Sequence, residues 1–575
     1  MRLRKGAGIL ICLTAALLSG CGRESYEKAA VSTFVQVQDK ESLYEEPMDE
    51  AVLYLTVGRS EGGIKSEHTW SEINAHPLEW YAENGIEPYE CDVLAQFGNE
   101  DGPTSRGFGF GDLSNNATIR LSGEKASLRQ QKSYKLRIYA DSGTVSGIRT
   151  LQLSKGFSDP FRFTGKLCYD LMSQADALMS VRTQFVHVYV KDETEEKSTL
   201  FEDYGLYTMT ETINKRYLKN RDLDGSGELY KIENFDFLRH EDVIKSPTDP
   251  DYDKEAFESL IESKGSSDNT KLLRLLDAVN DEERSIEEIV ESYFDKENLY
   301  TWMAFNILLD NKDTATENFY LYSPTGTEKF YILPWDNDGA LRADYETLRQ
   351  SDEVPGWQRG IHLFARSHLF SRICASKACI NELSDYVDRL HAGILSGENV
   401  AAAAGELEKT VKPYLYSMPD MIYARVTEEN YDKLIAQIPD QMDRNYDAYY
   451  ESQRTPSPFM VHTPEKKDGK IRISWEPATV LEGRVRYMVQ IADSWDFSTR
   501  IVEERGIWEN ELMSGNLPQG QYFIKVVAES ADGKTQTSFQ NYHTEKDTVA
   551  QGVLCFYVME DGSLHQALTH QADDE

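Results

Sequence analysis

Carboxylate and amide side chains flank two short apolar runs near the middle of the chain. Asp313 precedes the run 318–322, which begins with Asn318, and Asp336 follows the run 330–333. Phosphoryl chemistry needs a carboxylate that faces the attacking hydroxyl, and an amide oxygen and second carboxylate that hold a divalent metal. The two runs predict a β-hairpin, which would bring these three side chains to one place.

The segments on either side of this stretch must position it. Residues 51–235 contain short runs with β-type alternation, separated by turns. Residues 255–310 and 360–450 have the apolar period of helices. The pattern predicts an α+β fold, with the hairpin set between two helical stretches.

Several motifs in this region occur together. They include the run N-x-D-x-x-x-x-N-F-Y-L-Y around Asp313 and the later F-Y-I-L-P-W-D-N-D. Upstream are Arg120–Gly123, Lys132–Ile138, Gly205–Glu211 and Leu229–Lys231. In this order, over residues 50–450, they resemble the CotH family of spore-coat kinases. The resemblance implies an atypical protein-kinase-like fold, ATP and Mg²⁺ or Mn²⁺ as cofactors, and phosphorylation of Ser or Thr in secreted or surface proteins.

The resemblance also implies roles for individual residues. Asp313 would be the catalytic carboxylate, Asn318 and Asp336 would hold the metal, and Asp338 would be a supporting or second metal ligand. For the nucleotide phosphates, Lys135 is one candidate clamp, with Glu211 as its ion-pair partner. Lys231 is the alternative.

Two departures from the family pattern leave a second interpretation open. The turn at residues 122–125 reads Ser-Gly-Glu-Lys, and residues 191–197 form a charged insertion. The first interpretation is a surface-anchored kinase. The alternative is a non-catalytic surface scaffold or binding lipoprotein with a kinase-like body.

The N-terminus has the features of a lipoprotein signal. A basic start and a short apolar stretch precede Leu18-Ser-Gly-Cys21, so residues 1–20 are expected to be a signal peptide. The motif resembles a bacterial lipobox, which implies lipidation of Cys21. Residues 21–49 would be an acidic tether. The expected location is the extracellular face of the bacterial cell membrane, with the lipid as the sole membrane contact.

A calcium loop is a further hypothesis. Residues 222–233 fit a D-x-D-x-S-G-x-L-x-x-x-E pattern typical of an EF-hand-type loop. The alternative is a polar hairpin. The candidate Ca²⁺ ligands are Asp222, Asp224, Ser226, Glu228 and Glu233.

The C-terminal part is expected to be all β. Residues 457–546, with Trp475 and Tyr522 at characteristic strand positions, resemble a fibronectin type III sandwich that could bind a polysaccharide or a protein. Residues 547–575 would be a tail. The formal charge of −36 argues against nucleic acid as a partner. Five cysteines remain after Cys12 and Cys21, which predicts no disulfide framework.

Overall fold

The structure is a computed structural model that describes residues 37–58, 68–195, 198, 200–265, 268–349, 357–544 and 548–566. The expected signal peptide, the lipidated Cys21, part of the tether and the end of the tail lie outside the described residues. No helix in the described part of the chain is long and apolar enough to cross a membrane.

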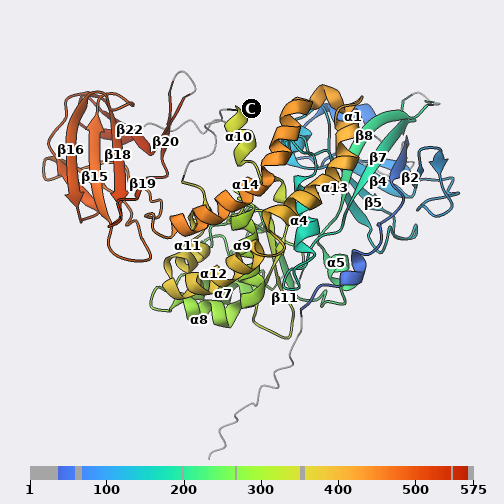
Figure 1. Cartoon of the computed structure of the whole chain (residues 1–575), viewed down its shortest axis with the longest axis horizontal. Coiled ribbons are helices and arrows are strands. Elements are labelled where there is room, and N and C mark those ends of the chain that lie inside the picture. Colours follow the sequence, from blue (N-terminus) through green and yellow to red (C-terminus); the bar gives the residue numbers. More distant parts are fainter. Residues whose placement is uncertain are drawn as a thin grey trace, which may run out of the picture. The chain divides into compact units, whose positions relative to one another are not determined.

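The first large unit is a closed β-barrel (Figure 1). Its strands run in the order β1-β7-β8-β6-β5-β4-β2, and β1 also pairs with β2, which closes the sheet. The β1–β7 pair is parallel and the other pairs are antiparallel. The strands are β1 (Val52–Gly58), β2 (Cys91–Asn99), β3 (Gly102–Pro103), β4 (Ala117–Leu121), β5 (Tyr134–Ile138), β6 (Thr150–Ser154), β7 (Thr183–Asp192) and β8 (Glu202–Glu211).

The alternation of side chains along the strands gives the barrel two faces. Leu136 on β5, Leu151 on β6 and Met209 on β8 are fully buried in the barrel core. Lys135 lies opposite Gln152, and Gln152 lies opposite Thr210, so this row points out of the barrel. The outer face therefore carries polar side chains.

The second unit is a small sheet among helices. The strand order is β10-β9-β11-β12, and Figure 1 shows β11 near the helices α7 to α9. Helix α9 is buried on all sides, as its mixture of aromatic and aliphatic residues requires. The strands are β9 (Glu228–Ile232), β10 (Ile261–Ser263), β11 (Phe319–Ser323) and β12 (Tyr331–Pro334). The main helices are α4 (Thr164–Met172), α7 (Thr270–Val279), α8 (Ile286–Tyr293), α9 (Lys296–Leu308), α11 (His368–Ala375), α12 (Lys377–His391), α13 (Gly397–Leu415) and α14 (Glu428–Ser452).

Shorter helices connect these parts. They are η1 (Glu41–Leu43), α1 (Trp70–Ala75), α2 (Leu78–Glu83), α3 (Glu124–Ser127), α5 (Lys215–Asn220), α6 (Lys254–Glu258), η2 (Asn337–Gly339), α10 (Ala343–Arg349), η3 (Gly360–Phe364) and η4 (Asp420–Tyr423). The predicted α+β class and the two helical stretches are confirmed.

The C-terminal part is all β, as expected. Its strands are β13 (Glu465–Lys467), β14 (Lys470–Ser474), β15 (Arg486–Ala492), β16 (Arg500–Ile507), β17 (Glu511–Ser514), β18 (Gly520–Glu529), β19 (Thr535–Thr537), β20 (Asn541–His543), β21 (Val549–Gln551), β22 (Val553–Val558) and β23 (Leu564–Gln566). Trp475 is buried, and the Tyr522 hydroxyl donates to the Pro518 carbonyl at 3.0 Å. The expected tail begins with strands, because β22 pairs with β18. The fibronectin type III identity stays a prediction.

Candidate functional site

The loop that follows α9 holds its polar side chains in an unusual backbone conformation. Asp310, Ala315 and Asn318 have positive φ values of 48°, 76° and 64°, a region that non-glycine residues rarely adopt. The Asn318 side-chain amide donates to the Asp313 carbonyl at 3.0 Å. Such conformations cost free energy and occur preferentially at functional sites.

The predicted hairpin is present and returns the chain to this loop. Phe319, which follows Asn318, lies opposite Pro334 in the pairing of β11 with β12. Asp336 comes two residues after Pro334 and so lies at the same end of the hairpin as Asn318. Asp336 also has a positive φ, 49°. A Cβ on Gly339 would lie 2.7 Å from the Cβ of Asp313, so the backbone after Asp336 packs closely on Asp313. The structure thus brings Asp313, Asn318, Asp336 and Asp338 together.

The carboxylates of this cluster act on one another. Asp336 is open to solvent, yet desolvation by the surrounding protein, followed by the charges of Asp338 and Asp313, raises its pKa to about 8. Desolvation and the charge of Asp338 also raise the pKa of Asp313. Glu317, which the sequence analysis missed, joins the cluster, because desolvation and Asp313 raise its pKa. Without a metal, Asp313, Glu317 and Asp336 therefore hold their protons more tightly than free carboxyl groups do.

A group of cations faces this acidic cluster. Desolvation and the charges of Arg120 and Lys264 lower the pKa of Lys135 to about 8. The charge of Lys231 acts both on Lys135 and on Asp336, so the two lysines that the sequence left as alternatives lie at one place. Lys231 also forms an ion pair with Glu233, with Nζ 2.6 Å from Oε1.

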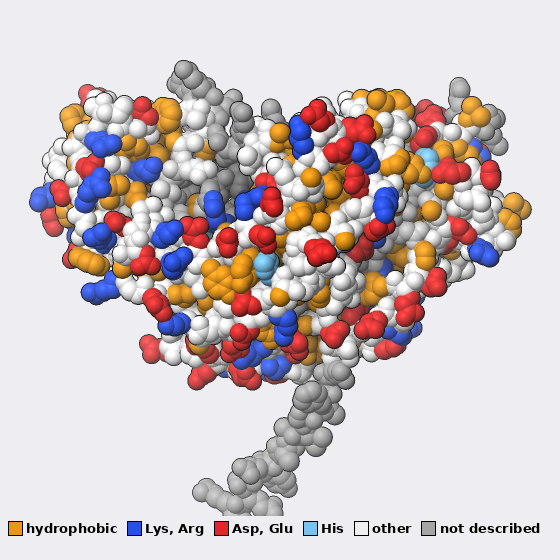
Figure 2. Space-filling model, viewed as in Figure 1, with side chains coloured by type: hydrophobic (Ala, Val, Ile, Leu, Met, Phe, Trp, Pro, Cys, Tyr) orange, Lys and Arg blue, Asp and Glu red, His pale blue; other side chains and the backbone are white. Residues whose placement is uncertain are grey.

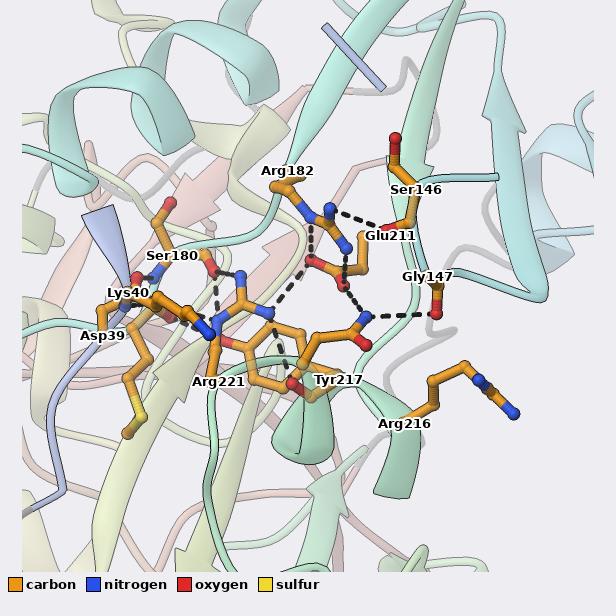
Figure 3. Close-up of polar contacts among 12 residues, drawn as sticks. Asp39, Lys40, Ser146, Gly147, Ser180, Arg182, Glu211, Arg216, Tyr217 and Arg221 are labelled. Carbon is orange, nitrogen blue, oxygen red and sulfur yellow. Dashed lines mark hydrogen bonds and ion pairs between the residues drawn. The ribbon is translucent and has the colours of Figure 1, made fainter. Parts of the chain in front are cut away.

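Glu211 is not the partner of Lys135. Glu211 lies opposite Leu151 in the strand register, on the inner side of the barrel, whereas Lys135 points outward. The Glu211 carboxylate instead binds Arg182 at 2.7 Å and Arg221 at 3.2 Å (Figure 3). Burial opposes ionisation, but the charges of both arginines lower the pKa of Glu211. Arg221 extends this network to Asp39 at 2.9 Å.

A hollow of about 470 Å³ lies along the outer wall of the barrel, although Lys135 itself does not line it. Arg137 lines it and lies two positions after Lys135 on β5, on the same face. Thr212 and Arg149 also line it, and among the described residues the Thr212 hydroxyl and the Arg149 Nε have no hydrogen-bond partner. Arg216 of α5 lines the hollow too, apart from the Glu211 network in Figure 3. The hollow thus has polar atoms left to bind a ligand.

The donor set fits Mg²⁺ or Mn²⁺. Both metals take carboxylate and amide oxygens, and Mg²⁺ is usually held by one or two carboxylates together with substrate phosphates. Among the described residues, no three His, Cys, Asp or Glu side chains are arranged to hold a metal by themselves. A metal bound by Asn318, Asp336 and Asp338 would therefore draw further ligands from a phosphate-bearing substrate.

The structure does not bring the five candidate calcium ligands together. The Asp224 carboxylate accepts hydrogen bonds from the Thr325 amide and hydroxyl at 2.9 and 2.7 Å, and Asp222 pairs with Lys40 at 2.8 Å. Ser226 donates its backbone amide to Asp224. Residues 228–232 form β9 instead of an exit helix. Glu228 and Glu233 therefore stand about 16 Å apart along the chain, at about 3.3 Å per residue.

The barrel and the helical unit thus carry an acidic cluster beside a cationic cluster. The chain matches the model of the CotH kinase protein family over residues 119–449 and belongs to that family. It is similar to the inner spore coat protein H of Bacillus subtilis (strain 168), with 24% identity over 227 residues. That alignment covers 39% of this chain and 58% of the relative, so the chain matches little more than half of the relative's length.

Two solved structures were also matched. The crystal structure of a Helicobacter pylori proinflammatory kinase, CtkA, is 10% identical and aligns over 55% of this chain and 90% of its own length, with a TM-score of 0.26. The Shewanella oneidensis MR-1 HipA, in a complex with HipB and operator DNA, is 9% identical over 52% of this chain and 58% of its own, with a TM-score of 0.22. At such scores the likeness carries no argument about this chain.

Proposed function

We propose that this protein transfers phosphate from ATP to Ser or Thr hydroxyls of other proteins. The observation that carries the proposal is the pairing of two opposite clusters at one site. The pKa of Asp336 is raised to about 8, so the acidic cluster would gain from a cation. The pKa of Lys135 is lowered to about 8, so the cationic cluster would gain from an anion. A divalent metal bound to nucleotide phosphates supplies both charges in one ligand.

The chain's own residues would share the work as follows. Asp313 would accept the proton of the acceptor hydroxyl. The hydroxyl oxygen would bond to the γ-phosphorus of ATP, while the bond from that phosphorus to the β-phosphate oxygen breaks and ADP leaves. Lys135 and Lys231 would bind the phosphates. A bound metal would neutralise the charge of the phosphate oxygens. Gly339 lets the backbone pack on Asp313 and so fixes its position.

The hollow lined by Arg137 and Thr150 is suited to the nucleoside end of ATP. Its volume of about 470 Å³ is in the range of small-molecule pockets. The unpartnered Thr212 hydroxyl and Arg149 Nε offer polar contacts. Replacing Thr150, which lines the hollow on β6, with Trp should weaken ATP binding by filling the space.

The proposed location is the outer face of the cell membrane, with the chain anchored through a lipid on Cys21. Support comes from the lipobox-like sequence Leu18-Ser-Gly-Cys21 and the charged segment that follows it. Protein acceptors would then be secreted or surface proteins. The alternative is a scaffold that binds without catalysis, which the following experiment distinguishes.

The decisive experiment is calorimetric titration of residues 22–575 with ATP, with and without Mn²⁺. We expect metal-dependent binding in the wild type, loss of it in Asp336→Ala, and retained binding without phosphate transfer in Asp313→Asn. Absence of ATP binding by the folded wild type would exclude the kinase and leave the scaffold. Metal-dependent binding without transfer to any acceptor, by wild type and Asp313→Asn alike, would make the site a nucleotide sensor.

A further inference from the structure

Three arginines, Arg129, Arg162 and Arg425, surround one aromatic ring at the edge of the candidate site. The Cζ atoms of Arg129, Arg425 and Arg162 lie 5.1, 4.6 and 5.9 Å from the centre of the Phe157 ring. Arg162 donates to the Lys155 and Tyr423 carbonyls and to the Gln131 side chain. The Nε of Arg425 also donates to the Phe157 carbonyl at 3.2 Å. Within the described ranges, neither Arg129 nor Arg425 forms an ion pair with a carboxylate. Positive charge therefore gathers around the Phe157 ring, which favours an anion nearby.

Exposed apolar side chains adjoin these arginines. Leu128 precedes Arg129 and is 50% exposed, while Met421 and Ile422, shortly before Arg425, are 50% and 64% exposed. Large apolar side chains beside cations on a surface are typical of a protein-binding site. We call the six residues Leu128, Arg129, Phe157, Met421, Ile422 and Arg425 the Phe157 surface.

A buried network holds the three segments of the Phe157 surface in place. Lys155 and Asp420 are 3% and 4% exposed and form an ion pair of 2.6 Å. Gln131 donates to the same carboxylate at 2.7 Å, and the Leu206 amide donates to it at 3.0 Å. Segments 128–131, 155–158 and 418–425 are therefore fixed to one another before any partner binds, which lowers the entropic cost of binding.

The Phe157 surface adjoins the acidic cluster that contains Asp313 and Asp338. Ser158, the residue after Phe157, donates its hydroxyl to the Asp338 carboxylate at 3.2 Å. Lys125, four positions before Arg129, acts through its charge on Asp313. A chain segment lying on the Phe157 surface would therefore reach the carboxylate that faces the acceptor hydroxyl.

The net charge of the whole chain bears on whether an acidic or a basic segment would bind selectively at the Phe157 surface. The net charge is −36, and Figure 2 shows Asp and Glu side chains spread among Lys and Arg over the visible face. A basic segment would find attraction at many places on such a protein. An acidic segment would be repelled by the protein as a whole and attracted where unpaired cations gather.

We propose that the Phe157 surface binds an acidic segment of the protein acceptor, in which carboxylates and apolar side chains lie near the phosphorylated Ser or Thr. The proposal rests on the proposed kinase function for the meaning of the acceptor. The binding step itself needs no ATP, so the two proposals can fail separately.

The test measures binding of short fluorescein-labelled peptides to residues 22–575 by fluorescence anisotropy. The peptides contain Ser and Leu with either Glu, Gln or Lys at the remaining positions. We expect the Glu peptide to bind about tenfold more tightly than the Gln peptide, with an affinity that falls as salt is added. The double variant Arg129→Glu/Arg425→Glu should lose at least about tenfold of this affinity.

A matched control separates local from global charge. Arg500→Glu/Arg505→Glu changes the net charge equally on two exposed arginines of β16 and should bind the Glu peptide like wild type. Arg129→Gln/Arg425→Gln serves if the charge reversal unfolds the protein. Equal binding of the Glu and Gln peptides, or unchanged binding in the Arg129/Arg425 variants, would overturn the proposal. Loss of Mn²⁺–ATP binding in those variants would also overturn it, by assigning these cations to the nucleotide.

Discussion

The carboxylate of Asp336 should make the metal-free protein less stable than it could be. We expect Asp336→Asn to raise the melting temperature of the metal-free chain while it abolishes binding of Mn²⁺–ATP. Asparagine keeps the shape of the side chain but carries no charge. It therefore removes the repulsion that Asp338 and Asp313 exert on the Asp336 carboxylate.

The size of the effect follows from the shift in pKa. The pKa of Asp336 rises from 3.8 to about 8 in the folded chain, and each unit is worth about 1.36 kcal/mol. Because Asp336 is open to solvent, water screens much of the free energy that this shift in pKa would otherwise represent. We expect a gain of about 1–2 kcal/mol near pH 7.5, or about 1–3 °C for a unit of this size.

The pH dependence gives the sharper test. The folded wild type holds the Asp336 proton more tightly than the unfolded chain does, so the contribution of Asp336 to stability falls as pH rises from about 4 toward 8. The advantage of Asp336→Asn should therefore grow over the same range. Melting curves in EDTA at pH 5 and pH 7.5 measure it. Asp222→Asn, at an exposed ion pair with Lys40, is the matched control and should shift stability by less than about 0.5 kcal/mol.

Either of two results would refute this reasoning. One is a melting temperature for Asp336→Asn at or below that of wild type at pH 7.5. The other is a gain that is equal at both pH values. In both cases the site would not store the electrostatic strain that its geometry implies.

Three further changes test other parts of the structure. Gly339→Ala places a methyl group 2.7 Å from the Cβ of Asp313, so Asp313 must shift, and it should lower the rate of phosphate transfer by at least about tenfold and also lower the melting temperature. Arg221→Met leaves Asp39 and part of Glu211 buried without a cation and should destabilise the chain by about 3 kcal/mol in urea unfolding. Burial lowers the pKa of His362 to about 4, so this one side chain should remove about 2 kcal/mol of stability from wild type between pH 7.5 and pH 5, and His362→Asn should lack this contribution. An equal loss in both proteins would contradict the last expectation.

Local patterns in the sequence were enough to predict the hairpin and the residues at its ends. Asp313, Asn318 and Asp336 lie close in the chain, and a strand pair joined by a short turn has few alternatives. The same reasoning could not choose between Lys135 and Lys231. They come from β5 and β9, and only the packing of one sheet beside another brings them together.

Two predictions failed where distant pairing overrides a local pattern. The motif with Glu211 is a strand, but the side it faces depends on the register with β6, which no local signal specifies. The calcium-loop pattern matches residue by residue, yet Leu229 to Ile232 pair with β11, so the exit helix that such a loop needs does not form. The closure of the barrel between β1 and β2 is equally non-local.

Barrel closure has a consequence for how copies of this chain could associate. A sheet that closes on itself offers no strand edge to a neighbour. Among the described residues, β16 is the longest strand at the edge of its sheet, and most of its side chains are exposed. It carries Arg500, Glu503, Glu504 and Arg505, and its pairing with β15 is interrupted by register shifts, both of which discourage a second strand from adding. If the charged side chains of β16 were replaced by apolar ones, β16 would become the strand at which copies of this chain could pair edge to edge and aggregate.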